Sequence, residues 1–287
     1  MQPQDHKQKV GIVTDSSVCL ARSLVQEYDI HIIPFQLLWD GEVYLDGEDM
    51  TRPEFFQRLS QDGDPPTTAQ PLPESFAEIY EKVAQEAESI LSLHIPESLS
   101  TTIQVARLMA REASVPVHVM STGTAGPGLG LVALAAARAA KAGASLRQIS
   151  AVAKACSQRV GLYIVMETLK YLNRGGRIGQ AAALVGTHLS IQPVLELKEG
   201  RIHVTAVVRN RERAKERMLD EMERRVGSCA ISTVIFHAIA LDEAQELAQQ
   251  IRQRFQCIES WTMEFTPVVG VHTGPGSLGV AFCLQDA

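Results

Sequence analysis

Val10-Gly11-Ile12-Val13-Thr14 is followed by Asp15-Ser16-Ser17, so a short apolar run ends in a polar turn. The run predicts a buried strand, and the turn is typical of a helix N-cap, so we expect a helix leading up to Tyr28. Further strands are predicted over residues 30–39, 90–95 and 115–120, with helices between and after them. This repeated strand-then-helix pattern predicts an α/β fold with a parallel or mostly parallel sheet.

The second part of the chain has a different pattern. Strands are predicted over residues 191–197 and 202–208, and Lys198-Glu199-Gly200-Arg201 between them is typical of a hairpin. Other strands are expected at residues 163–166, 233–237, 258–265, 268–272 and 278–284, and helices at residues 210–226 and 241–255. Consecutive strands indicate a mixed or antiparallel sheet flanked by helices. The sequence therefore predicts an N-terminal lobe, residues 1–159, and a C-terminal lobe, residues 160–287.

Composition limits the classes of function. The chain has 287 residues, of which 45% are hydrophobic and 21% charged, as in ordinary globular proteins. It carries 27 Lys and Arg against 33 Asp and Glu, which gives a formal net charge of −6. Because this balance is mildly acidic, it argues against a general nucleic-acid binder, which needs a broad basic face.

Cysteine usage and hydropathy indicate the compartment. The five cysteines are odd in number and form no CxxC pair: Cys19, Cys156, Cys229, Cys257 and Cys283. We therefore expect no disulfide framework or zinc site, and a reduced cytoplasmic setting. Residues 1–9 are polar and no stretch approaches the ~20 apolar residues of a membrane span, so a soluble protein is expected. The acidic residues between 40 and 49 do not match a calcium loop, and no metal site is predicted.

A nucleotide site is not expected either. Gly126-Pro127-Gly128-Leu129-Gly130 superficially resembles a dinucleotide loop, but it contains a proline and lacks an acidic residue about 20 positions later. A turn at the start of a helix explains these glycines better. No GKS or GKT motif occurs, which excludes an ordinary P-loop.

Tyr171-Leu172-Asn173-Arg174-Gly175-Gly176-Arg177-Ile178-Gly179-Gln180 combines a double glycine with an arginine. The glycines suit a helix C-cap or a close backbone approach. Arg177 stands before the small residues 181–185, which are predicted to be helical. It would either cap the preceding helix through its carbonyls or hold an anionic head group above an apolar hole, and local chemistry favours the cap.

A second candidate is His272-Thr273-Gly274-Pro275-Gly276, where a histidine precedes a stiff turn. Thr67, Thr68 and Gln70 on a proline-rich loop, and Ser100 at a helix start, offer neutral hydrogen-bond donors. Each of these side chains is also explained as a cap or turn residue. A Ser–His hydrolase of the G-x-S-x-G type would need a nucleophile elbow, and the sequence contains none.

Together, these segments resemble those of one family. In order they are Ile12-Val13-Thr14-Asp15-Ser16-Ser17, Pro66-Thr67-Thr68-Ala69-Gln70-Pro71, Ser98-Leu99-Ser100-Thr101-Thr102, Leu169-Lys170-Tyr171-Leu172-Asn173-Arg174-Gly175-Gly176-Arg177-Ile178, Ile191-Gln192-Pro193-Val194-Leu195, Arg209-Asn210-Arg211 and His272-Thr273-Gly274-Pro275-Gly276. Their order and spacing closely resemble the DegV family of bacterial fatty-acid-binding proteins. The resemblance covers essentially the whole chain, and its L-x-x-GGRI and H-x-GPG segments are specific.

The resemblance implies a two-lobed DegV-like α/β fold with one fatty acid, such as palmitate, stearate or oleate, buried between and within the lobes. It implies the role of the FakB-type subunit of bacterial fatty acid kinase. Such a subunit takes a fatty acid from the membrane by transient contact and presents its carboxylate to a separate ATP-dependent kinase subunit. The product is an acyl phosphate for phospholipid synthesis. The binding subunit is not itself an enzyme, and it needs no catalytic residue, metal or cofactor.

The resemblance also implies site residues. Thr68, Ser100 and His272 match the family's carboxylate contacts. Arg209 matches an arginine near the head group or the kinase-docking face. Secondary candidates are Arg177, Gln70, Thr67 and Thr101.

This sequence departs from the family pattern at three places. Ala69 replaces a usual serine, Thr101 replaces a usual glycine, and Ser121-Thr122 replaces a common Asp-Ser pair. Thr101 adds a Cβ beside Ser100 and puts the head-group geometry there in question.

The apolar run after the double glycine suggests a wall for the lipid tail, although ordinary core packing explains such residues equally well. The candidates for tail contact are Ile178, Ala182, Leu184, Ile191 and Val194, together with Ala181, Val185, Leu189 and Leu195. Two other functions stay open. One is an autonomous hydrolase or acyltransferase that uses Ser100 and His272. The other is a binder of a different amphipathic anion or a regulatory interaction module.

Overall fold

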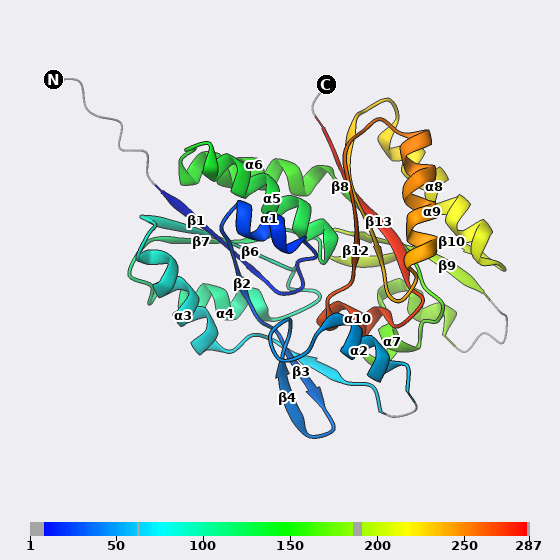
Figure 1. The fold of residues 1–287 in the computed structure, drawn as a ribbon, viewed down its shortest axis with the longest axis horizontal. Coiled ribbons are helices and arrows are strands. Elements are labelled where there is room, and N and C mark those ends of the chain that lie inside the picture. The colour runs from blue at the N-terminus through cyan, green and yellow to red at the C-terminus, as the bar shows by residue number, and fades with distance from the viewer. Residues whose placement is uncertain (1–8, 62–63, 186–190, 286–287) are drawn as a thin grey trace.

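The computed structural model describes residues 9–61, 64–185 and 191–285 (Figure 1). Its N-terminal part is built on a sheet with strand order β2-β1-β6-β7. The strands are β1 (Val10–Asp15), β2 (Ile30–Ile33), β6 (Ser89–His94) and β7 (Val117–Ser121), and every neighbouring pair is parallel. The carboxyl ends of these strands lie at one edge of the sheet, where ligands commonly bind in such folds.

The C-terminal part is built on a mixed sheet with strand order β10-β9-β8-β13-β11-β12. The strands are β8 (Val160–Val165), β9 (Gln192–Lys198), β10 (Arg201–Val208), β11 (Ile231–His237), β12 (Cys257–Glu264) and β13 (Leu278–Leu284). Strands β11 and β12 are parallel, and the other neighbours are antiparallel. The predicted hairpin connects β9 to β10.

Helices form three layers around these two sheets (Figure 1). The outer layers are α3 (Pro73–Ala84) with α4 (Thr102–Met109) on the parallel sheet, and α8 (Arg211–Val226) with α9 (Leu241–Arg254) on the mixed sheet. The middle layer is α5 (Pro127–Lys141) and α6 (Leu146–Arg159), which contact strands of both sheets. Helix α5 is apolar on all sides up to Ala137, and its many alanines and glycines let the two sheets approach it from opposite sides. The largest apolar cluster fills this layer.

A small antiparallel sheet, β4-β3-β5, connects the two halves. It contains β3 (Gln36–Trp39), β4 (Glu42–Leu45) and β5 (Thr67–Ala69), with α2 (Arg52–Leu59) beside it. Strands β3 and β5 and helix α2 all pack against α10 (Pro267–Thr273), near the other end of the chain. Segments from both ends of the sequence therefore meet here.

The prediction of one strand over residues 30–39 is wrong, because β2 and β3 belong to different sheets. Pro34 lies between them and has no N–H to donate to a strand ladder. Phe35 N instead donates to Ser16 Oγ at 3.0 Å. The chain thus leaves the parallel sheet at the proline.

The prediction of a strand over residues 268–272 is also wrong, because these residues belong to helix α10. Pro267 occupies the first turn of this helix, where a missing N–H costs nothing. Gly270 has no side chain where a Cβ would overlap the ring of Phe55 or Phe56. The sequence V-V-G-V-H is typical of a strand. These residues are nevertheless helical, and Gly270 of the helix packs closely against Phe55 and Phe56 of α2.

Two helix predictions need adjustment. The turn at residues 15–17 does not start a helix, because Ser17 donates to the Asp15 carboxylate and α1 (Arg22–Glu27) begins later. Residues predicted as a helix over 181–185 lie largely in the 3₁₀ helix η1 (Gly179–Leu184). The double glycine follows α7 (Lys170–Arg174), with Gly175 at its C-cap, as predicted.

The predicted fold class, a mostly parallel N-terminal sheet and a mixed C-terminal sheet with helices, is confirmed. The predicted lobe boundary at residues 159 and 160 falls at the junction of α6 and β8. None of the helices in the described ranges is long and apolar enough to cross a membrane.

Candidate functional site

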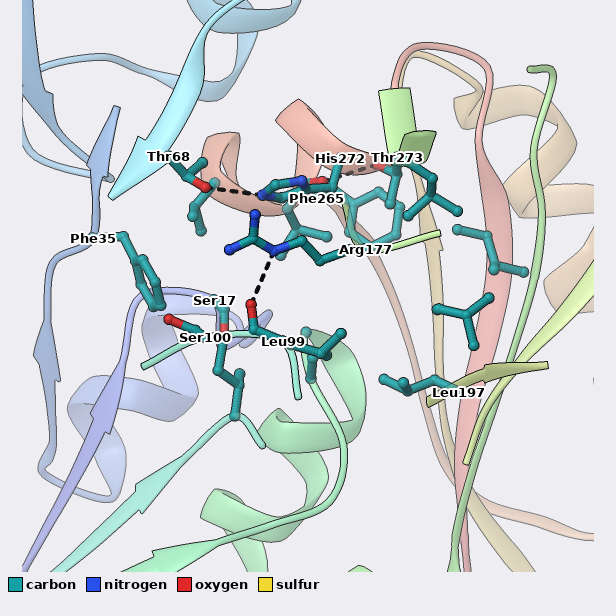
Figure 2. Close-up of a pocket in the computed structure, with 18 of the residues that line it drawn as sticks. Ser17, Phe35, Thr68, Leu99, Ser100, Arg177, Leu197, Phe265, His272 and Thr273 are labelled. Atoms are coloured by element: carbon teal, nitrogen blue, oxygen red, sulfur yellow. Dashed lines mark hydrogen bonds between the residues drawn. The ribbon is translucent and has the colours of Figure 1, made fainter. Parts of the chain in front are cut away.

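A cavity of about 360 Å³ lies between the carboxyl edge of the parallel sheet and the inner face of the mixed sheet (Figure 2). The turns after β1, β6 and β7 form one side of it, and β8 to β11 form the other. Most of its wall is apolar: Phe35, Ile95, Leu99, Leu162, Ile164, Met166, Leu172, Leu197, Ile202, Phe236, Phe265, Val268 and Val269. The volume falls within the ~300–1,000 Å³ of typical small-molecule sites.

Polar side chains gather at one end of this cavity. Thr68 on β5, Ser100 before α4, Arg177 after α7 and His272 on α10 all line it. In Figure 2, Thr68, His272 and Arg177 lie together, and Leu197 lies well away from them. Three of these four positions were predicted carboxylate contacts, and the structure brings all three into one cavity.

His272 and Thr68 form a pair at this polar end. Thr68 Oγ1 and His272 Nε2 are 2.9 Å apart, while Nδ1 is buried without a partner among the described residues. Burial lowers the pKa of His272 to about 4, and the nearby Arg177 guanidinium acts in the same direction. The imidazole is therefore neutral at neutral pH. With its proton on Nε2, it donates to Thr68 and leaves the threonine hydroxyl proton for an acceptor in the cavity.

Glycines fix the position of this histidine. A Cβ on Gly175 would overlap His272 Nδ1, and a Cβ on Gly274 would overlap the ring of Tyr171. The GGR and H-x-GPG segments thus pack directly against each other. Gly176 and Gly274 have φ values of 68° and 73°, which glycine adopts without strain. The two motifs form one structural unit, although they lie far apart in the sequence.

Arg177 is fixed in the cavity wall by two backbone carbonyls. Its Nε donates to Leu99 O at 3.0 Å, and Nη1 donates to Gly175 O at 2.5 Å. A guanidinium has five N–H donors, so three are not used by these bonds. Arg177 therefore caps carbonyls, as local chemistry favoured, and it also faces the cavity beside His272.

Ser100 lies just before α4 and is already engaged locally. Its Oγ lies 2.8 Å from Thr102 Oγ1 and accepts from Thr102 N at 3.3 Å. Thr101 has φ −79°, an ordinary backbone conformation, so its Cβ introduces no backbone strain. Thr101 Oγ1 instead donates to Gln70 Oε1, and both residues line the cavity.

Two secondary candidates lie outside this cavity. Thr67 is exposed on β5 and lines a smaller adjoining pocket of about 100 Å³, which also touches Thr68, Arg177 and His272. Arg209 follows β10 and is exposed. Neither side chain meets the polar end of the main cavity.

Among the residues that the structure describes, none of the predicted tail contacts lines this cavity. Ala182 and Val185 are exposed, and Val194 packs toward α8 and α9 on the far face of the mixed sheet. Ile178, Ala181 and Leu195 are buried in the central cluster, and Leu184 and Ile191 are half-buried, all outside the cavity wall. Leu189 lies outside the described residues.

Strand β8 supplies apolar cavity-wall residues that sequence reasoning missed. Leu162 and Ile164 face the cavity, while Tyr163 and Val165 face α8 and α9. A strand alternates its faces, so this division follows period two. However, residues 160–166 are all apolar or glycine, and no polar residue marks which face is which.

The arrangement does not resemble a hydrolase. Ser100 and His272 are paired with Thr102 and Thr68 rather than with each other, and His272 Nδ1 has no carboxylate to orient it in the described chain. A buried Ser–His–Asp chain does exist at Ser92, His94 and Asp15, with distances of 2.7 Å and 2.9 Å. These three side chains are fully buried inside the N-terminal lobe and reach no cavity. Their hydrogen bonds connect the end of β1 to β6.

Metal chemistry finds no support in this site. Among the described residues there is no cluster of three or more His, Cys, Asp or Glu side chains placed to hold a metal ion. The glycines at residues 126–130 form the start of α5, as predicted, and Gly126 with φ 54° lines the cavity.

Comparison with known proteins gives a consistent result. The model of the DegV family, whose description is that of an uncharacterised protein family, matches residues 9–285. A DegV domain-containing protein of Streptomyces coelicolor is 37% identical over 273 residues, which is 94% of this chain and 97% of the relative. A solved DegV family structure from Thermus thermophilus, described by its fatty acid binding, is 33% identical with a TM-score of 0.91 and covers 96% of this chain and 100% of that one. A DegV lipid-binding protein from Thermotoga maritima is 25% identical with a TM-score of 0.88, covering 97% and 99%.

Proposed function

The chain belongs to the DegV family, and from that premise we propose that it binds the anion of a long-chain fatty acid in the cavity of Figure 2. The observation that carries the proposal is the division of this cavity, which has an apolar wall and one polar end. The polar end joins a fixed arginine to a neutral histidine–threonine pair. The fatty-acid-binding relative from Thermus thermophilus supports the same class of ligand.

The apolar wall supplies the affinity for the tail. Each buried CH₂ contributes about 0.8 kcal/mol, so a tail of ~15 methylenes contributes roughly 12 kcal/mol before ordering costs. Part of this is lost because the ligand becomes ordered and because a bilayer is also apolar. The shape of the cavity, and not only the apolar area that it buries, then determines which tails bind.

The polar end makes burial of the carboxylate possible. A buried carboxylate is costly unless it accepts several hydrogen bonds. The unused N–H groups of Arg177 and the hydroxyls of Thr68 and Ser100 are the donors at hand. His272 strengthens the Thr68 donor through its own bond to Thr68 Oγ1.

We further propose that the bound carboxylate is phosphorylated by a separate ATP-dependent kinase subunit, and that this chain is the non-catalytic binding subunit. The small pocket beside Thr67 and Arg174 supports this, because it touches the same Thr68, Arg177 and His272 from another side. It gives a partner a short path to the head group. Exposed Arg209 is a candidate for the partner-facing surface.

The same proposal places the protein in a bacterial cytoplasm, in transient contact with the membrane that supplies its ligand. The acyl phosphate product would enter phospholipid synthesis. Transfer of oleate from vesicles to the protein, followed by separation of the two on a sizing column, tests the membrane step.

Binding is tested by denaturing extraction of the purified protein and mass spectrometry of the extract. We expect one fatty acid per chain, and uptake of added palmitate, stearate or oleate by delipidated protein. Thr68→Val should weaken uptake about tenfold, since a bond to a charged group is lost. Thr67→Val is the matched control, because its side chain lies outside the cavity. No lipid in the extract and no uptake would refute the proposal.

The kinase step has its own test. The isolated protein with fatty acid and ATP should release no ADP, and addition of a fatty acid kinase catalytic subunit should start ADP release that depends on the fatty acid. Turnover of ATP or of an acyl ester by the isolated protein would contradict the non-catalytic role.

A further inference from the structure

A small pocket of about 100 Å³ adjoins the polar end of the main cavity, and Thr68, Arg177 and His272 line both spaces. Its other lining residues are Pro65, Pro66, Thr67, Tyr171, Arg174, Gly175 and Val271. The volume is well below the ~300 Å³ at which sites for whole small molecules begin, so the pocket suits a group of a few atoms. It is therefore a subsite of the polar end rather than a separate ligand site.

The lining of this pocket is positively charged. It contains the guanidinium groups of Arg174 and Arg177, and no Asp or Glu of the described chain lines it. The carboxylate near Arg174 is that of Asp64, whose Oδ1 lies 3.4 Å from Arg174 Nη1. The Arg174 side chain is 42% exposed and that of Asp64 is 91% exposed, and ion pairs in such positions contribute ~0–1 kcal/mol. Asp64 therefore competes only weakly with another anion for Arg174.

Arg177 spans the two spaces. Its Nε donates to the carbonyl of Leu99, which lines the main cavity, and its Nη1 donates to the carbonyl of Gly175, which lines the small pocket. These bonds hold the guanidinium in place and use two of its five N–H donors. The planar fork of a guanidinium suits both carboxylate and phosphate oxygens. The remaining donors of Arg177 can therefore serve a carboxyl group and a phosphoryl group attached to it.

We propose that the small pocket holds the phosphoryl group of an acyl phosphate whose acyl chain lies in the main cavity, with Arg174 and Arg177 as its contacts. This inference rests on the proposed function, which makes an acyl phosphate at this end of the cavity. In that reaction a carboxylate oxygen forms a bond to the γ-phosphorus of ATP. The bond from this phosphorus to its bridging oxygen breaks, and ADP leaves with the electron pair. No proton is gained or lost.

The change of charge in this reaction gives Arg174 its role. A fatty acid carries one negative charge, which the guanidinium of Arg177 balances. A phosphoryl group carries about −1.5 to −2 near pH 7, more than one guanidinium can balance. Arg174 supplies the second positive charge. Because Arg174 lines the small pocket and not the main cavity, it distinguishes the acyl phosphate from the fatty acid.

The test compares two ligands of equal acyl length on delipidated protein. One is palmitate, and the other is the phosphonate in which CH₂ replaces the bridging oxygen of palmitoyl phosphate, so that it cannot hydrolyse. Displacement of a fluorescently labelled fatty acid measures both affinities. We expect the wild type to bind the phosphonate at least as tightly as palmitate. A wild type that binds palmitate but not the phosphonate would overturn the proposal.

Variants of α7 locate the phosphoryl group. Arg174→Gln should weaken the phosphonate about tenfold, the loss of one bond to a charged group, and change palmitate affinity by less than about twofold. Arg174→Lys keeps the charge without the fork and should recover part of the loss. Lys170→Gln is the matched control, because Lys170 is exposed on the same helix and lies outside the pocket. It should leave both affinities within about twofold of the wild type.

Two results with the variants also contradict the subsite. Equal weakening of the phosphonate by Arg174→Gln and Lys170→Gln would show general attraction of an anion. Equal loss of palmitate and phosphonate affinity in Arg174→Gln would show that Arg174 does not distinguish the two ligands.

Palmitate binding separates this proposal from the one on which it rests. Protein that takes up neither ligand contradicts the fatty-acid function itself. Protein that binds palmitate, but whose phosphonate affinity does not depend on Arg174, contradicts only the phosphoryl subsite.

Discussion

His272 is a titrating group whose protonation opposes folding. Its folded pKa of about 4 lies below the ordinary 6.5, so the unfolded chain binds the extra proton first as the pH falls. Its contribution to stability is therefore complete above about pH 6.5 and is lost as the pH falls through 4. Between pH 7.5 and pH 5 the loss is about 2 kcal/mol.

Urea unfolding of delipidated protein at pH 7.5 and pH 5 measures this loss. The wild type should lose about 2 kcal/mol more than His272→Asn, which does not titrate. An identical pH dependence of the two proteins would show that the histidine is not held neutral.

Gly175 is where a single methyl group should disturb the site most. Gly175→Ala places a Cβ against His272 Nδ1, so the ring must move away from Thr68. We expect oleate affinity to fall about fivefold, the cost of one neutral hydrogen bond. Gly176→Ala has free space around its Cβ but φ 68°, so it should cost about 1 kcal/mol of stability and leave affinity unchanged. Fluorescence titration with a labelled fatty acid separates the two.

At the scale of elements, the buried carboxyl of Asp46 contacts the first turn of α10, where it accepts a hydrogen bond from Val268 N at 3.3 Å. Burial raises the pKa of Asp46 to about 7, against the opposing hydrogen bonds from Ser16 and Val268. This folded pKa lies above the ordinary 3.8. The contribution of Asp46 to the free energy of unfolding is therefore complete below about pH 3.8 and is lost as the pH rises through 7.

Asp46→Asn should keep both contacts without this titration. Relative to the wild type, the variant should gain about 2–3 kcal/mol of unfolding free energy between pH 5 and pH 8. Chemical denaturation across this range measures the difference in unfolding free energy between the variant and the wild type. A difference that stays constant with pH would mean that Asp46 remains ionised throughout.

Elements also show what a sequence can and cannot predict. Hydrophobic periodicity and turn residues located the strands around residues 10–15 and 89–94 and the hairpin after β9. They failed for α10, because V-V-G-V-H has strand character and its helix depends on packing against Phe55 and Phe56. The motifs that carry Thr68, Ser100 and His272 are specific, and the structure brings these side chains to one cavity; their contact with a head group stays a prediction. The β8 part of the cavity wall was missed because β8 is apolar on both faces.

At the scale of the whole molecule, the distance from the polar end to Leu197 should set the tail length. Leu197 is buried at the cavity wall away from Thr68 (Figure 2). Leu197→Trp should shift the extracted fatty acids toward shorter chains, at a stability cost of about 1–3 kcal/mol for overpacking. Val207→Trp, at an exposed position of β10, is the control and should leave the lipid profile unchanged. Mass spectrometry of extracts compares the three proteins.

The order in which the site is assembled has a consequence for synthesis. Thr68 and His272 are separated by 204 positions, and the last strand, β13, inserts between β8 and β11 in the middle of its sheet. A ribosome must therefore release almost the entire chain before Thr68 and His272 can pair or the cavity has its second wall. Under the proposed function, truncated nascent chains would not sequester lipid, and a bound fatty acid would report that translation was completed.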